Sequence, residues 1–208
     1  MSPALLSGVA GIVQGARHAL EPDHITAVAT VMVRAPSPGR GVFYAGCWGL
    51  GHAAMLVLVG GPLVVLGVEL PDRVTTVLEL LVGAMLVYLG LRTLRESKHD
   101  HPAVDPKASA LERGKRPFAI GVMHGLAGSG ALAALIALAA PTVTAGLMSL
   151  ALYAAGTVLG MVALALLAGP VLARAGKLPR LAPLLCRVAG VMSIVVGVVW
   201  AVRTLAGV

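Results

Sequence analysis

Charged and aromatic side chains are both scarce in this 208-residue chain, at 12% and 3% of the residues. A soluble domain carries about 25% charged residues, so the low fraction argues against an ordinary soluble fold. Two cysteines, Cys47 and Cys186, are too few for a disulfide framework or a Cys-based zinc site. A cleavable signal peptide is not expected, because no basic segment precedes the first apolar stretch.

Apolar residues are abundant instead, at 58% of the chain with a mean hydropathy of +0.91. Small residues among them allow helices to pack closely in lipid. Six stretches are long enough to cross a bilayer, which takes about 20 residues of helix. We therefore predict an all-α, polytopic membrane protein with six transmembrane helices. The predicted spans are residues 4–33, 42–68, 73–94, 117–139, 143–173 and 182–206.

The net charge of +7 is concentrated in three predicted loops. Twelve of the sixteen Lys and Arg residues follow the first, third and fifth spans. By the positive-inside rule these loops, including the polar loop 95–116, are cytoplasmic, and both termini lie outside the cell membrane. The positive charge is therefore explained by the orientation of the protein in the membrane. We expect the lipid bilayer, and not nucleic acid, as the partner of this protein.

The two halves of the chain resemble each other. Tyr44-Ala-Gly and Leu50-Gly-His match Tyr153-Ala-Ala and Leu159-Gly-Met, and a third match joins the segments that begin at Val82 and Ala189. With three spans per half, we predict an inverted 3+3 repeat, as in many transporters. Its parts are residues 1–94, the loop 95–116 and residues 117–208. Shared apolar composition is the alternative source of these matches.

Ionisable side chains interrupt the apolar spans. A charge at mid-membrane costs roughly 2.5–3.5 kcal/mol on insertion scales, so such residues are functional candidates. In this chain they are Arg17, His18, Glu21, Asp23, His24, His52, Glu79 and His124.

Three of these candidates cannot face one ion from a regular helix. At 100° per residue, Asp23 and His24 would point about 140° and 120° away from His18. Pro22 removes a backbone donor and disfavours helical angles at Glu21. We therefore predict a broken first helix whose unwound segment turns the three side chains toward one cavity. The alternative is a kinked helix in which Asp23 caps the second half and His18 bonds a backbone carbonyl.

Two more histidines complete the predicted site. His52 follows glycines that permit its helix to approach the first one closely. His124 is the repeat partner of His18, and its glycine-rich continuation predicts another loosened helix, with Ser129 in the place of the first-half carboxylate. A satisfied core histidine is the alternative for each.

Other polar residues are expected to support the site rather than bind metal. Arg17 and Glu21 have the i,i+4 spacing of a helical ion pair, and Pro22 provides the break. Glu79 is either an ion relay or an interhelical hydrogen-bonding group. His99 and His101, in the polar loop, are either solvated or collect metal at the cytoplasmic side.

The ligand types indicate the metal. Imidazoles with a carboxylate suit nickel, cobalt, copper or zinc, whereas magnesium and calcium prefer oxygen ligands. The lack of a cysteine cluster argues against copper(I). We expect a divalent transition metal as a transported substrate and not as a cofactor, bound by His18, Asp23, His24, His52 and His124.

The segment Arg17–Ile25, which reads R-H-A-x3-D-H-I, resembles the signature of the nickel/cobalt permease family, the NiCoT/NicO superfamily. The segment Val122–Ser129 resembles the second-half motif of its shorter, urease-accessory (UreH-like) branch. This resemblance implies nickel or cobalt as substrate, bound by His18, Asp23, His24 and His52. Two features depart from the larger members: a helix before the signature helix and an acidic-threonine motif in the second half are both missing.

A secondary permease is the function that these features predict, and we do not expect an enzyme. The membrane potential favours inward movement of a divalent ion by about 4.6 kcal/mol per 100 mV, so uptake is preferred over efflux by proton antiport. An intramembrane zinc hydrolase is a further alternative, although there is no His-Glu-x-x-His helix. A thiol carrier using Cys47 and Cys186 is disfavoured because they are not repeat-equivalent. A homo-oligomer is compatible with all of these.

Overall fold

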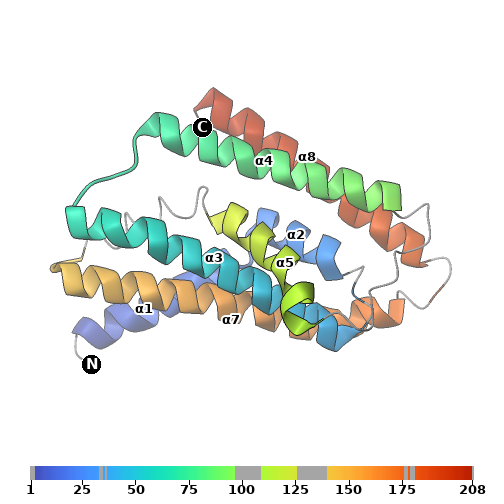
Figure 1. The fold of residues 1–208 in the computed structure, drawn as a ribbon, viewed down its shortest axis with the longest axis horizontal. Coiled ribbons are helices and arrows are strands. Elements are labelled where there is room, and N and C mark those ends of the chain that lie inside the picture. Colours follow the sequence, from blue (N-terminus) through green and yellow to red (C-terminus); the bar gives the residue numbers. More distant parts are fainter. Residues whose placement is uncertain are drawn as a thin grey trace.

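The computed structural model describes residues 3–32, 35, 37–96, 109–125, 140–175, 178 and 181–207. Within these residues the chain forms seven α-helices and no strand (Figure 1), so the predicted all-α class is confirmed. The helices are α1 (Pro3–His18), α2 (Pro22–Met32), α3 (Pro38–Leu66), α4 (Asp72–Glu96), α5 (Ala110–Gly125), α7 (Val143–Ala175) and α8 (Leu181–Ala206).

Four of the described helices, α3, α4, α7 and α8, are long and apolar enough to cross a membrane. The chain is therefore a membrane protein. The other described helices, α1, α2 and α5, have 16, 11 and 16 residues, which is too short for any of them to span a bilayer alone. The presence of six spans stays a prediction.

The first predicted span consists of two helices. Helix α1 ends at His18 and α2 begins at Pro22, with residues 19–21 non-helical. The amides of Leu20 and Glu21 donate to the carbonyl oxygens of Arg17 and His18, at 2.9 and 3.0 Å, so the chain tightens into turns three residues long instead of continuing the α-helix. Pro22 then suits the first position of α2, where no amide donor is needed. The predicted break is confirmed.

Helix α5 begins earlier than the predicted span, inside the segment predicted as a loop. The amide of Ser109 donates to Glu112 Oε2 at 2.7 Å, and the amide of Glu112 donates to Ser109 Oγ at 3.2 Å. This reciprocal pair is a capping box, which starts a helix. The hydrogen bond from the Ser109 amide also lowers the pKa of the exposed Glu112 carboxyl. The Ser-x-x-Glu pattern of Ser109 and Glu112 could have predicted this helix start from the sequence.

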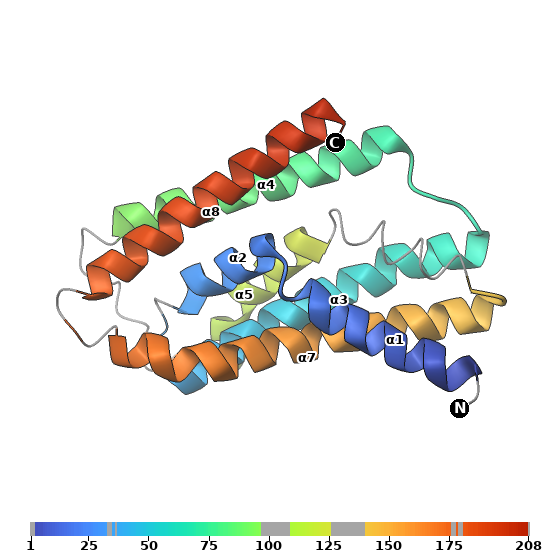
Figure 2. The same cartoon turned by 180° about the vertical axis from the view of Figure 1, so that it is seen from behind.

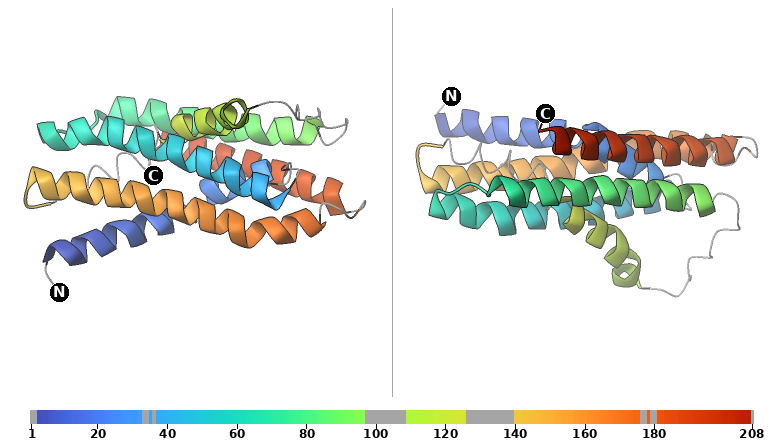
Figure 3. Two further views of the ribbon diagram at one scale, coloured as in Figure 1. Left: turned by 60° about the horizontal axis from the view of Figure 1, so that its bottom comes forward. Right: turned by 90° about the horizontal axis from the view of Figure 1, so that it is seen from above.

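The helices form two layers with α2 between them (Figures 1 and 2). In one layer α5 packs on α3, α3 on α7, and α7 on α1, while α4 and α8 pair to form the other. Figure 3 shows α1 and α5 at opposite edges of the α3–α7 pair. Helix α2 contacts α3, α4, α7 and α8. Its first turn, which carries Asp23 and His24, therefore lies inside the molecule.

Helices α4 and α8 approach each other closely at two pairs of glycines. A Cβ atom on Gly83 would lie 2.9 Å from the carbonyl oxygen of Gly197, and one on Gly90 would lie 2.5 Å from that of Gly190. Real Cβ atoms do not come this close to a backbone oxygen, so only glycine permits the contact. Small residues are the usual means of packing helices in lipid.

Two side-chain hydrogen bonds also join α4 to α8. Ser193 Oγ donates to the carbonyl oxygen of Leu86 at 2.7 Å, and Thr204 Oγ1 donates to Glu79 Oε2 at 3.0 Å. Of the two roles predicted for Glu79, the interhelical hydrogen bond is the one that the structure contains.

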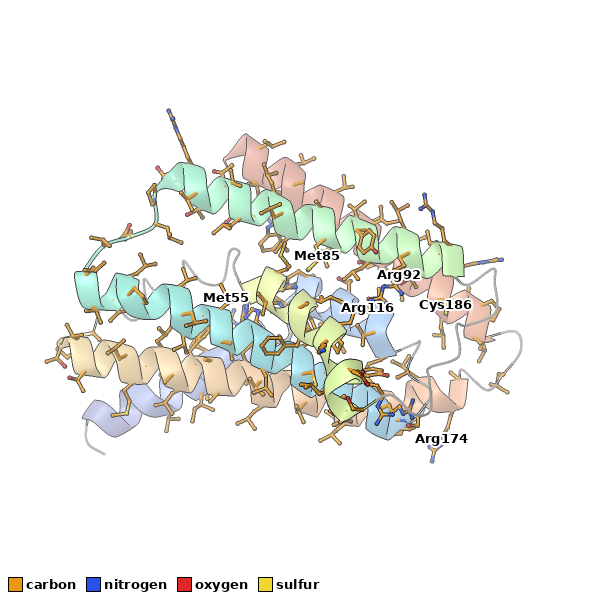
Figure 4. All side chains as sticks on the ribbon, in the orientation of Figure 1. Met55, Met85, Arg92, Arg116, Arg174 and Cys186 are labelled. Atoms are coloured by element: carbon orange, nitrogen blue, oxygen red, sulfur yellow. The ribbon has the colours of Figure 1, made fainter. Side chains whose placement is uncertain are left out.

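Basic side chains gather toward one end of the molecule. Figure 4 shows Arg92, Arg116 and Arg174 in the half opposite to the two chain ends marked in Figure 1. These residues come from two of the three segments in which the sequence concentrates positive charge, those after the third and the fifth predicted spans. They therefore share one side of the protein, as the positive-inside argument requires.

Candidate metal centre

All five residues predicted as metal ligands meet at the break between α1 and α2. His18 is the last residue of α1, Asp23 and His24 lie in the first turn of α2, His52 is in the middle of α3, and His124 is in α5. Each is buried, with an exposed fraction between 0 and 4%. Whether they bind metal stays a prediction, but the structure brings every one of them together.

Close packing at glycines places two of these helices against the cluster. A Cβ atom on Gly15, one turn before His18, would overlap the carbonyl oxygen of Tyr153 in α7. A Cβ atom on Gly121, one turn before His124, would overlap the carbonyl oxygen of Trp48 in α3. The missing side chains therefore let α1 and α5 bring their histidines to the centre of the molecule.

Three imidazoles form the first group of ligands, which we call the histidine triad: His18, His24 and His52. One ligand atom from each lies within 4.8 Å of the others. The ring centroids of His18 and His24 are 4.3 Å apart, and those of His24 and His52 are 5.1 Å apart. Three protein ligands of this kind can hold a transition metal ion while leaving a coordination position open.

The second group, which we call the carboxylate triad, contains Asp23, His24 and His124, again with ligand atoms within 4.8 Å. His124 Nε2 donates a hydrogen bond to Asp23 Oδ2 at 2.8 Å. Asp23 Oδ1 lies 3.1 Å from His24 Nδ1, at ion-pair distance but without the alignment of a hydrogen bond. The carboxylate thus faces two imidazoles and does not cap α2, so the kinked-helix alternative is not what the chain adopts.

Within the described part of the chain, seven of the eight imidazole nitrogens of these four histidines make no hydrogen bond. The exception is His124 Nε2. A buried polar atom without a partner costs about 1–3 kcal/mol, so such a concentration calls for an explanation. The lone pairs of neutral imidazoles are the donors that a transition metal takes up. Both nitrogens of His52 are among the unpartnered ones, so it is not a satisfied core histidine.

Sequence reasoning missed two aromatic side chains that cover the cluster. The Trp48 ring stacks on that of His24, with centroids 5.7 Å apart and planes inclined by 27°. The Tyr153 ring, from α7, lies 5.7 Å from that of His18. Trp48 stands one helical turn before His52, and this spacing could have revealed it. Nothing local could have revealed Tyr153, because it comes from the other half of the chain.

Glu21, and not Arg17, is the residue of the predicted ion pair that reaches the cluster. Glu21 Oε2 lies 2.9 Å from His18 Nδ1, again without hydrogen-bond alignment, and its side chain is 41% exposed. The predicted Arg17–Glu21 ion pair does not form among the described residues, and Arg17 is exposed. The reason is the helix break: α1 ends at His18, so the four-residue spacing is no longer helical.

Other candidates lie elsewhere. Ser129, His99 and His101 fall outside the described residues. Cys47 lies in α3 and Cys186 lies in α8.

With an all-α membrane architecture and a buried histidine cluster established, the chain belongs to the family described as the cytochrome C biogenesis protein transmembrane region, whose model matches residues 26–199. This match includes His52 and His124 but begins just after His24. The family match therefore covers the helices that surround the break but not His18, Asp23 and His24 at the break itself.

Two relatives extend the comparison. The urease accessory protein UreH of Bacillus sp. (strain TB-90) is 30% identical over 201 residues, covering 90% of this chain and 87% of that protein. The chloroplast protein FOR GROWTH AND FERTILITY 1 of Arabidopsis thaliana is 31% identical over 179 residues, covering 76% of this chain and 48% of that protein, so this chain spans about half of that relative. No solved structure matches significantly. The UreH-like part of the resemblance is thereby confirmed, whereas membership of the nickel/cobalt permeases stays a prediction.

Proposed function

We propose that this protein is a permease that carries a divalent transition metal ion, nickel or cobalt, across a membrane through its buried histidine cluster. The observation that carries this proposal is the convergence of five candidate ligand side chains from α1, α2, α3 and α5, in which seven of the eight imidazole nitrogens make no hydrogen bond to a described residue. Histidines with one carboxylate are typical of nickel, cobalt and zinc sites.

The helix break favours transport over a static structural site. Broken helices with non-helical backbone at the binding site are how many secondary transporters hold their ions. The ligands also come from both halves of the chain, since His124 belongs to the second half and the others to the first. A relative movement of the halves would therefore open or close the site.

Inverted symmetry is part of this proposal, and the α4–α8 contacts support it. In the sequence repeat, Gly83 corresponds to Gly190 and Gly90 to Gly197. Exchanging the halves thus turns the contact between Gly83 and Gly197 into the contact between Gly190 and Gly90, and both contacts are present. The packing of α1 on α7 likewise corresponds to that of α5 on α3. We propose that α1 and α2 together make the first of six spans, and that residues 117–139 make the fourth.

Nickel is the preferred substrate, with uptake as the direction. The motif at Arg17–Ile25 resembles that of nickel/cobalt permeases, and the name of the Bacillus relative, a urease accessory protein, is in keeping with nickel. An inside-negative potential drives a divalent cation inward by about 4.6 kcal/mol per 100 mV. We propose a cell-membrane location with the basic end cytoplasmic, both termini outside, and no enzymatic reaction.

Flux measurements test the proposal. Purified protein is reconstituted into liposomes that contain a nickel-sensitive dye, and an inside-negative potential is imposed. We expect saturable Ni²⁺ influx that Co²⁺ competes with and that Mg²⁺ leaves unchanged, because Mg²⁺ prefers oxygen ligands and dehydrates reluctantly. Influx no faster than in protein-free liposomes would contradict the permease. Protein-bound metal that hydrolyses a lipid or peptide, without flux, would favour the hydrolase alternative.

Tryptophan fluorescence should report metal binding directly. The chain has two tryptophans, and Trp48 is 1% exposed and stacked on His24. In a Trp200→Phe background we expect Ni²⁺ to quench most of the remaining emission, because the open-shell ion would bind beside the indole. The matched Trp48→Phe protein, which keeps only Trp200, should respond weakly. Equal quenching of the two proteins would contradict binding in the cluster.

A further inference from the structure

The metal-binding side chains are divided into two groups that share one residue. His24 belongs to both the histidine triad and the carboxylate triad. The centroid of its ring lies 4.3 Å from that of the His18 ring and 4.2 Å from that of the His124 ring. His24 is also 0% exposed, so it occupies the middle of the cluster.

A carboxylate accompanies each group. Asp23 is itself a member of the carboxylate triad, and its carboxylate oxygen accepts the hydrogen bond from His124. Glu21 lies 2.9 Å from His18 in the histidine triad. A divalent ion in a low-dielectric site needs nearby negative charge to offset its desolvation. Each group thus has one carboxylate beside it, although Asp23 is buried and Glu21 is 41% exposed.

We infer that the transported ion occupies two positions in turn, first one triad and then the other, with His24 as the ligand that it keeps throughout. This inference rests on the proposed transport function. In the step between positions, the metal bonds to His18 and His52 break while bonds to Asp23 and His124 form. The hydrogen bond between His124 Nε2 and Asp23 Oδ2 breaks in the same step, and the His124 proton moves to Nδ1, so that the Nε2 lone pair is free for the metal. No electron is transferred, and the number of protein ligands stays at three.

The two positions differ in their access to the exterior. Among the described residues, the histidine triad reaches the outside of the helix bundle through Glu21, which touches His18 and is 41% exposed. The carboxylate triad is completed by His124 from α5, in the other half of the chain. The shared ligand therefore connects the two halves of the protein.

Two positions that bind the ion weakly also serve transport better than one position that binds it tightly. An ion must bind well enough to enter and weakly enough to leave, and several adjacent sites achieve this. A single sphere of four imidazoles and a carboxylate would hold the ion with every available ligand and release it slowly.

X-ray absorption on the purified protein in lipid nanodiscs, loaded with less than one Ni²⁺ per chain, tests this inference without any substitution. We expect no more than three imidazoles around each nickel ion, as the composition of the two triads requires. Four imidazoles around one nickel would overturn the two-position inference.

Substitutions separate the two positions. In His52→Ala the carboxylate triad is intact, so we expect two imidazoles and a carboxylate oxygen around nickel. In His124→Ala the histidine triad is intact, so we expect three imidazoles. Because the other position remains in each variant, at least one of the two changes should weaken Ni²⁺ binding by no more than about twofold, whereas His24→Ala, which removes a ligand from both positions, should weaken it by about 100-fold or more.

The outcomes distinguish this inference from the proposed function. Identical nickel spectra for His52→Ala and His124→Ala, or losses of affinity equal to that of His24→Ala, would indicate one site and overturn the inference. If the unaltered protein transports nickel but shows one four-imidazole site, the proposed transport function is retained and only the two-position inference is refuted. If it neither binds nor transports nickel, the proposed function itself is refuted.

Discussion

Alanine at His24 is expected to reduce Ni²⁺ influx into proteoliposomes to the rate of protein-free vesicles. His24 is fully buried and belongs to both groups of ligands, so its loss removes a donor from each of them. A loss of affinity of at least about 100-fold corresponds to roughly 2.8 kcal/mol. The measurement is the initial rate of dye response at a fixed membrane potential.

A control variant on the same helix makes this result specific. Thr30 is also buried, and among the described residues its hydroxyl bonds only the carbonyl oxygen of Ala27 within α2, to which it donates at 2.8 Å. Thr30→Ala should therefore keep its nickel influx. Both variants must elute from size-exclusion chromatography like the unaltered protein. Normal influx through folded His24→Ala protein would remove the cluster from the transport pathway.

The second large effect is expected at Gly51, which lies next to His52 in α3. A Cβ atom on Gly51 would overlap the carbonyl oxygen of Phe118 and lie 3.0 Å from the amide nitrogen of Val122, both in α5. Gly51→Ala must therefore push α5 away, and overpacking of this kind costs about 1–3 kcal/mol. Because α5 carries His124, the displacement should also weaken nickel binding.

Gly61, on the same helix, provides the matched control. A Cβ atom there would meet no atom of a described residue within 4 Å. Gly61→Ala should be neutral, or stabilising by up to about 1 kcal/mol from helix propensity. Thermal unfolding in detergent and nickel titration by Trp48 fluorescence measure both effects. An unfolding temperature for Gly51→Ala equal to or above that of Gly61→Ala would show that the α3–α5 contact is not as close as the structure has it.

Local chemistry accounts for the parts of the site that were predicted correctly. Pro22 disfavours helical angles just before it, and this effect is confined to neighbouring residues, so the break could be placed from the sequence. Histidines and carboxylates inside apolar spans are costly, which singles them out without knowledge of the fold. For this reason all five residues that meet in the cluster were named beforehand.

The errors also have physical reasons. The Arg17–Glu21 ion pair was inferred from helical spacing, but the break that Pro22 causes ends that helix at His18. The start of α5 was placed too late because charged residues near Glu112 looked like loop, although Ser109 and Glu112 form a capping box. At both places two local signals compete: the proline break overrides the helical spacing of Arg17 and Glu21, and the capping box overrides the polar composition around Glu112.

By itself, the sequence determined that this chain is a helical membrane protein, that its first span is broken, and which side chains are candidates for binding metal. These features follow from hydropathy, proline sterics and the cost of burying polar groups, all of which act along a short segment. Only the tertiary structure decided how the candidates are grouped. Asp23 and His124 are 101 residues apart, and their contact depends on how α5 packs on α3 through glycines. Side-chain partners so distant in the chain are selected by helix packing, which no short segment encodes.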